Sequence, residues 1–140
     1  MPDMTVKAQD VWVAMMGRYM NGQGPIVALQ ARELPNTAAY VLLKLRRKCQ
    51  AEIADIDKAR ELICQKLANK NEDGTPKMLE GGGYDIPDLN AFGAAFNDLL
   101  QQPVTLTGVR ALRPSEFGAA LMSAQEMEDL GPFLSDDVAA

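Results

Sequence analysis

The sequence contains no histidine, and this absence excludes several common kinds of catalytic and metal site. Without an imidazole, zinc sites built from cysteine and histidine cannot form, and neither can nucleophiles activated by a neighbouring histidine. Carboxylates are abundant, but pairs such as Asp55 and Asp57 lie two residues apart on a predicted helix and so point in different directions. We therefore expect a protein that is not an enzyme and has no cofactor or metal ion.

Cysteine is scarce as well, because Cys49 and Cys64 are the only two in 140 residues. On one continuous helix they would lie about 22 Å apart along the axis, which is too far for a disulfide bond. We interpret both as small buried hydrophobic residues, with a reactive thiol as the alternative.

Long hydrophobic runs are missing too. No stretch approaches the roughly 18 apolar residues of a membrane span, and the N-terminal segment lacks the pattern of a secretory signal. A hydrophobic content of 47% is nevertheless enough to form a core. We expect one domain over residues 1–140 that does not enter a membrane and stays inside the cell.

The most regular segment is residues 36–70, where the spacing of apolar residues predicts one long helix. Asn36 is expected to cap it after Pro35, and the turn at 71–74 to end it. Steps of three and four residues, typical of a helix face, separate Leu42, Leu45, Cys49, Ile53, Ile56, Arg60, Ile63 and Leu67. At about 50 Å, such a helix is longer than a compact domain of this size needs.

Shorter elements are predicted on both sides of this helix. Asp10 is expected to cap a helix over 11–20, Pro25 to begin another, and Asp88 to cap a helix whose apolar face packs on the long one. Residues 104–107 alternate like a strand, with 109–112 as a hairpin partner and 4–8 as an edge strand or lead-in. A flexible glycine-rich link is predicted at 74–88. After the strand, we expect a short turn or helix capped by Ser115 and a helix that begins with a capping box at Ser123–Glu126. The acidic end at 135–140 is expected to be frayed.

These elements predict a mainly α (α+β) fold. We expect a long antiparallel helical hairpin with short flanking helices and a small β-hairpin or sheet.

The net charge of −5 is unevenly distributed. Residues 36–71 carry eight basic and four acidic side chains, whereas residues 72–140 carry three basic and twelve acidic ones. Lys44, Arg46, Arg47 and Lys48 form the densest basic cluster, with 44, 47 and 48 on one helical face and Arg46 to one side. No aromatic residue interleaves with the cluster, so we favour a solvated face or contact with an acidic protein surface over nucleic-acid binding.

Arg60 interrupts the apolar face of the long helix. Its simplest role is to extend its charged end into solvent, or to form an ion pair with a nearby carboxylate such as Asp57, three residues earlier. The alternative is a contact across a partner interface that sets the register between two helices. Arg60 therefore joins the basic cluster as a candidate interaction residue.

Four segments, in this order and spacing, resemble a family of small helical-hairpin proteins from tailed bacteriophages. They are ALQARELPNTAAYVLLKL, EIADIDKARELICQKLANKNEDG, LNAFGAAFNDLLQQPVTL and SAQEMEDLGPFL, which together span most of residues 27–134. The family is catalogued as of unknown function, so the resemblance implies a phage context and no catalytic residues.

This context, with the absence of catalytic residues, predicts a non-enzymatic phage protein that acts through protein–protein contacts. Virion or tail assembly is the favoured role. The expected partner is another protein or a second copy of this chain in a homo-oligomer. The alternative is an inhibitor of a host defence complex, similar to anti-CRISPR proteins, whose acidic surface mimics nucleic acid. The expected location is the cytoplasm of the infected bacterium, with incorporation into the virion left open.

Overall fold

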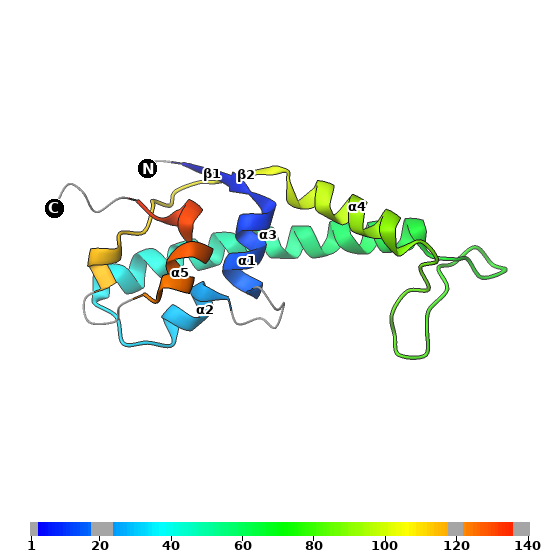
Figure 1. Cartoon of the computed structure of the whole chain (residues 1–140), viewed down its shortest axis with the longest axis horizontal. Helices are drawn as coiled ribbons and strands as arrows, with labels where there is room; N and C mark the ends of the chain where they lie inside the picture. Colours follow the sequence, from blue (N-terminus) through cyan, green and yellow to red (C-terminus); the bar gives the residue numbers. More distant parts are fainter. Residues whose placement is uncertain (1–2, 18–23, 118–121, 136–140) are drawn as a thin grey trace.

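The longest element of the computed structural model is helix α3, Asn36–Leu67, which runs along the long axis of the molecule (Figure 1). The structure describes residues 3–17, 24–117 and 122–135. No glycine or proline interrupts the 32 residues of α3, so its hydrogen-bonded ladder continues for about 48 Å. The predicted long helix is confirmed, with its boundaries shifted: Pro35 is the N-cap, and the helix ends before Ala68.

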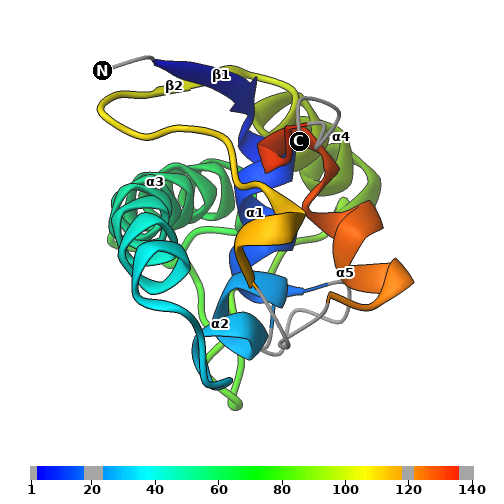
Figure 2. The same cartoon turned by 90° about the vertical axis from the view of Figure 1, so that its left-hand side faces the viewer.

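Short elements cover one side of the first half of α3 and form the main core with it. Helix α1, Ala8–Met16, and helix α2, Pro25–Gln30, both pack against it. Their buried residues Val11, Ile26 and Leu29 meet Leu42 and Leu45 of α3. Figure 2 shows α1, α2 and α5 on one side of α3 at this end of the molecule, which leaves the opposite side of α3 uncovered by the elements that the structure describes.

A two-stranded antiparallel sheet joins two segments that lie about 100 positions apart in the sequence. Strand β1, Met4–Lys7, pairs with β2, Pro103–Leu106, in a register that sets Met4 opposite Leu106. The predicted strand near 104–107 and the edge strand near residue 4 are confirmed. The hairpin partner predicted at 109–112 is wrong, because Leu112 instead forms a parallel bridge with Leu134, and β2 pairs with β1 near the start of the chain.

Helix α4, Leu89–Leu100, packs against the second half of α3 (Figure 1). The side chain of Asp88 accepts a hydrogen bond from the backbone N–H of Ala91 at 3.0 Å, so the predicted cap is confirmed. Phe96 meets Trp12 edge to face, with ring centres 5.6 Å apart, in a second core cluster that includes Ile56. No residue of α4 is fully buried, so the expected apolar face is only partly covered.

The glycine-rich segment between α3 and α4 forms two short turns at the end of the molecule where α3 ends and α4 begins (Figure 1). Isolated antiparallel bridges join Lys70 to Pro76 and Met78 to Tyr84. The Tyr84 hydroxyl also donates a hydrogen bond to Glu61 of α3 at 2.9 Å. These contacts give the segment a defined path, and its flexibility stays a prediction.

The C-terminal elements fold back over the first half of the molecule. They are the 3₁₀ helices η1, Pro114–Phe117, and η2, Gly131–Phe133, with helix α5, Ala124–Asp129, between them. Ser123 and Glu126 form the predicted capping box of α5. Glu126 also forms an ion pair with Arg32, which follows α2, through two hydrogen bonds of 2.6 and 2.9 Å. This pair links α5 to the part of the molecule formed by α1, α2 and the first half of α3, which we call the head.

Two further predictions are corrected. Asp10 is not the N-cap of α1, because the helix begins at Ala8 and Asp10 instead accepts the backbone N–H of Lys7 at 2.8 Å. Ser115 is not a cap either, because the 3₁₀ helix η1 begins at Pro114 and contains it; the short turn or helix predicted there is itself present as far as Phe117, where the described range ends. The predicted helical residues 18–20 and the acidic end at 136–140 lie outside the described residues.

Candidate functional site

Three of the predicted basic residues line one pocket on the outer side of α3. Lys44, Arg47 and Lys48 form one wall, because steps of three and four residues place them on the same helical face. The opposite wall is the turn that follows β2, formed by Thr107, Gly108 and Val109, and the pocket has a volume of about 560 Å³. Figure 2 shows how the chain after β2 crosses over α3 to reach η1. We call this the basic pocket.

Arg46 and Arg60 lie away from the basic pocket. The guanidinium group of Arg46 donates a hydrogen bond to the side-chain oxygen of Gln30 in α2, so its role is to hold α2 on α3. Arg60 lies 3.6 Å from Asp57, which confirms the predicted ion pair. Both side chains of that pair are about half exposed, so it adds little to stability.

The cations of the basic pocket lack the ion pairs that two nearby arginines form. Arg32 and Arg110 both form close ion pairs, with Glu126 and Glu116. Within residues 3–17, 24–117 and 122–135, no carboxylate forms an ion pair with Lys44, Arg47 or Lys48. Lys48 instead donates to the hydroxyl oxygen of Thr107 at 3.5 Å, a long and weak hydrogen bond.

Tyr40 and Leu43 extend this surface by one helical turn, and sequence reasoning missed them. The Lys44 ammonium nitrogen lies 5.0 Å from the centre of the Tyr40 ring, so the expectation that no aromatic residue accompanies the cluster is wrong. The exposed fraction is 59% for Tyr40 and 37% for Leu43. We call these two residues and the three pocket cations the outer face of α3.

Helical spacing could have identified Tyr40, because positions 40, 44 and 47 are separated by four and three residues. The turn at 107–109 could not be found in this way. It lies more than 55 positions further along the chain, and the β1–β2 pairing brings it over α3.

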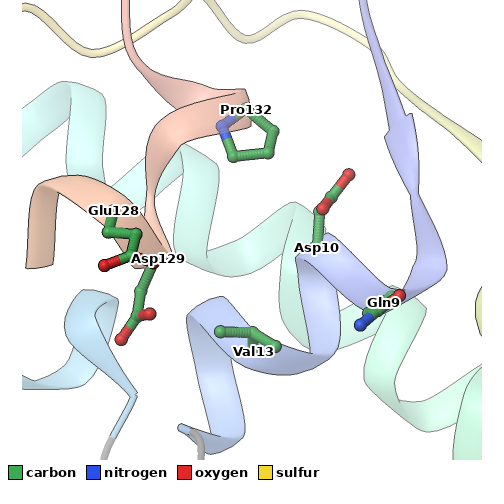
Figure 3. Close-up of a pocket in the computed structure, with 6 residues that line it drawn as sticks. All are labelled: Gln9, Asp10, Val13, Glu128, Asp129 and Pro132. Atoms are coloured by element: carbon green, nitrogen blue, oxygen red, sulfur yellow. The ribbon is translucent and has the colours of Figure 1, made fainter. Parts of the chain in front are cut away.

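A second pocket, of about 490 Å³, lies between α1 and α5 and carries acidic side chains (Figure 3). The figure shows the Asp10 carboxylate pointing away from those of Glu128 and Asp129. Asp10 accepts the N–H of Lys7, and Asp129 accepts a hydrogen bond from Gln125 at 2.9 Å. The carboxylates do not converge on one point, so this pocket lacks the geometry of an acid–base pair.

The two cysteines are buried and unpaired, as predicted. Burial raises the pKa of the Cys49 thiol to about 12, with the charge of Glu52 adding to the effect, so this thiol stays protonated and unreactive near neutral pH. In the described part of the chain, no cluster of three or more cysteine, aspartate or glutamate side chains is placed to hold a metal ion. No helix there is long and apolar enough to cross a membrane.

Comparison of the chain with protein-family models, curated proteins and solved structures gives no match. The resemblance to phage proteins therefore stays a prediction from the order of the sequence segments. The outer face of α3 combines exposed apolar groups with cations that form no ion pair among the described residues, and this combination is typical of a contact surface.

Proposed function

We propose that this chain is a non-enzymatic protein of a tailed bacteriophage that acts through protein–protein contacts in virion or tail assembly. The phage context rests on the resemblance described above. The contact role rests on the surface of the molecule and needs no catalytic group.

The outer face of α3 is the observation that carries this proposal. Tyrosine and arginine are, with tryptophan, enriched at the energetically dominant positions of protein interfaces. Here Tyr40 and Arg47 lie two helical turns apart on a helix whose inner side is locked into the core. A rigid helix loses little conformational entropy on binding, so an exposed aromatic and cationic face on α3 is well suited to a protein partner.

The far half of the molecule offers a second contact surface. There we propose that α3 and α4 act as an extended helical hairpin. Four of its apolar side chains are at least 48% exposed: Leu62, Met78, Leu79 and Leu89. Exposed apolar groups of this kind favour self-association, which would hide them from water.

Mass spectrometry of purified particles tests the proposal. Particles of the phage whose genome encodes this chain should contain it, or should accumulate as incomplete assemblies when its gene is deleted. The point variant to compare with the deletion is Arg47→Glu, which reverses one exposed charge on the outer face of α3 and leaves the core residues unchanged. Phage that carry this variant should show the same assembly defect while producing normal amounts of folded protein.

A different result would redirect the proposal. If the deletion phage assembles normally but fails to grow on bacteria that carry a nucleic-acid-targeting defence system, the assembly role is wrong. The chain would then be an inhibitor of that system, acting through its acidic half.

A further inference from the structure

The basic pocket combines three positive charges with a complete second wall, and this combination indicates a ligand. Lys44, Arg47 and Lys48 project from one face of α3, and Thr107 and Gly108 face them from the turn after β2. Gly108 has a φ of 72°, a left-handed conformation that glycine adopts without strain. The wall opposite the cations is therefore set by the local backbone conformation.

The charge of the pocket is not balanced by the chain itself. Like charges spaced three and four residues apart destabilise a helix, and α3 places such a pair at Lys44 and Lys48. No acidic side chain lines the pocket, and none in the described ranges forms an ion pair with its cations. An anion from outside the chain would remove this repulsion.

The surroundings of the pocket favour a protein carboxylate over a phosphate backbone. Val109 supplies an apolar wall, and the exposed apolar groups of Leu43 and Tyr40 continue the same face. Lys44 already lies over the Tyr40 ring, where a stacked base would have to bind. The net charge of −5 further opposes the approach of a long polyanion.

We infer that the basic pocket binds an aspartate or glutamate side chain from an acidic segment of a partner protein, with an adjacent aliphatic residue of that segment on Leu43 and Tyr40. The cations of α3 bind the carboxylate, and the apolar strip selects a peptide over a free anion. This inference rests on the proposed contact role of the outer face of α3, and it adds the chemistry of the partner.

The probe is a fluorescein-labelled peptide in which two aspartates precede a leucine within a glycine–serine sequence. Binding is measured by fluorescence anisotropy, and the occupied site by NMR shifts of the backbone amides of Thr107, Gly108 and Val109. The comparison probes are the same peptide with asparagines, inorganic phosphate, and a 20-base-pair DNA duplex, all at about 150 mM salt.

Two variants of α3 make a matched pair. Lys48→Glu reverses a charge in the pocket, and Lys58→Glu makes the same change at an exposed position outside it. We expect saturable binding of the acidic peptide that falls at least about tenfold in Lys48→Glu and less than about twofold in Lys58→Glu. The asparagine peptide should bind at least about tenfold more weakly, because it lacks the charge.

Three results would overturn the inference: no saturable shift at 107–109, equal losses in the two variants, or tighter binding of phosphate or DNA than of the acidic peptide. Circular dichroism of both variants shows whether each is folded before it is compared. If the acidic peptide fails while the protein is found in purified particles, only the partner chemistry is wrong. If the peptide binds and the protein plays no part in assembly, only the assembly role is wrong.

Discussion

At the scale of single residues, α3 places the same side chain in opposite environments. Leu45 is completely buried among residues of α1, α2 and the C-terminal elements, whereas Leu62 in the second half of the helix is 64% exposed. Sequence periodicity already separates these two leucines, because Leu45 belongs to the predicted apolar face and Leu62, the residue before Ile63, lies off it. The free energy of burial sets the size of the difference.

Truncation of these two leucines should therefore have different costs. Leu45→Ala should lower the free energy of unfolding by about 2–5 kcal/mol, because it leaves a cavity in the main core. Leu62→Ala should change it by no more than about 0.5–1 kcal/mol, because little packing is lost. Urea denaturation of both variants checks this, and equal losses would mean that the second half of α3 is covered in solution.

The ion pair between Arg110 and Glu116 makes stability depend on pH. The Arg110 guanidinium lies 2.5 and 2.8 Å from the two carboxylate oxygens of Glu116, and both side chains are partly buried. This hydrogen bonding lowers the pKa of Glu116; burial opposes the effect, and the charge of Arg113 adds to it. A carboxyl group with a lowered folded-state pKa stabilises the protein above its unfolded-state pKa, and this contribution is lost as the pH falls through the folded-state value.

We therefore expect wild-type protein to lose more stability than Glu116→Gln between about pH 6 and about pH 3. The variant lacks the titrating group, so the difference between the two curves isolates Glu116 from the other carboxylates. Urea denaturation at each pH measures it. Parallel curves would show that the Arg110–Glu116 pair does not form in solution.

At the scale of elements, the contact between α1 and α2 depends on the absence of a side chain. Gly24 caps α2 and donates its backbone N–H to the carbonyl oxygen of Met15 at 3.2 Å. A Cβ atom added there would lie 2.3 Å from the carbonyl oxygen of Ala14, and neither backbone can move without separating the two helices. Gly93, in the middle of α4, has no neighbouring atom within 4 Å of such a Cβ.

The same substitution should consequently have opposite effects at these two glycines. Gly24→Ala should destabilise the protein by at least about 2 kcal/mol, because the new methyl group overlaps the backbone of α1. Gly93→Ala should stabilise it by about 0.5–1 kcal/mol, because alanine has less backbone freedom in the unfolded chain and is a better helix former. Thermal and urea denaturation give both values, and a destabilised Gly93→Ala would indicate that a partner surface lies against α4.

At the scale of the whole molecule, α3 extends beyond the head and carries an uneven distribution of charge. The first half of α3 is basic and packs against α1 and α2, whereas most of the second half runs beside α4 and the turns at 68–88 (Figure 1). Residues 72–140 carry a net charge of −9. A molecule with separated positive and negative regions and exposed apolar residues favours contacts between copies.

Self-association is accordingly expected at micromolar concentrations. Size-exclusion chromatography with light scattering should give a mass above that of the monomer, decreasing between about 50 mM and about 500 mM salt as charged contacts are screened. Arg47→Glu should reduce this mass if the outer face of α3 is part of the contact. A monomer at high micromolar concentration, unchanged by salt, would contradict this expectation.

The sequence by itself determined the features that depend on neighbouring residues. Helix α3, the capping of α4 by Asp88 and the capping box at Ser123 follow from helix periodicity and side-chain hydrogen bonds within a few positions. The Arg60–Asp57 pair and the shared face of Lys44, Arg47 and Lys48 have the same origin. Such features depend on interactions between residues that lie three or four positions apart in the sequence.

Only the tertiary structure decided the features that join distant segments. The pairing of β1 with β2, the turn at 107–109 over α3 and the partial exposure of α4 could not be read from local patterns. Residues 104–107 would form a strand with any suitable edge, and β1 supplies that edge from about 100 positions earlier. The choice of partner depends on which packing of the whole chain buries the most apolar surface, and no local pattern contains that comparison.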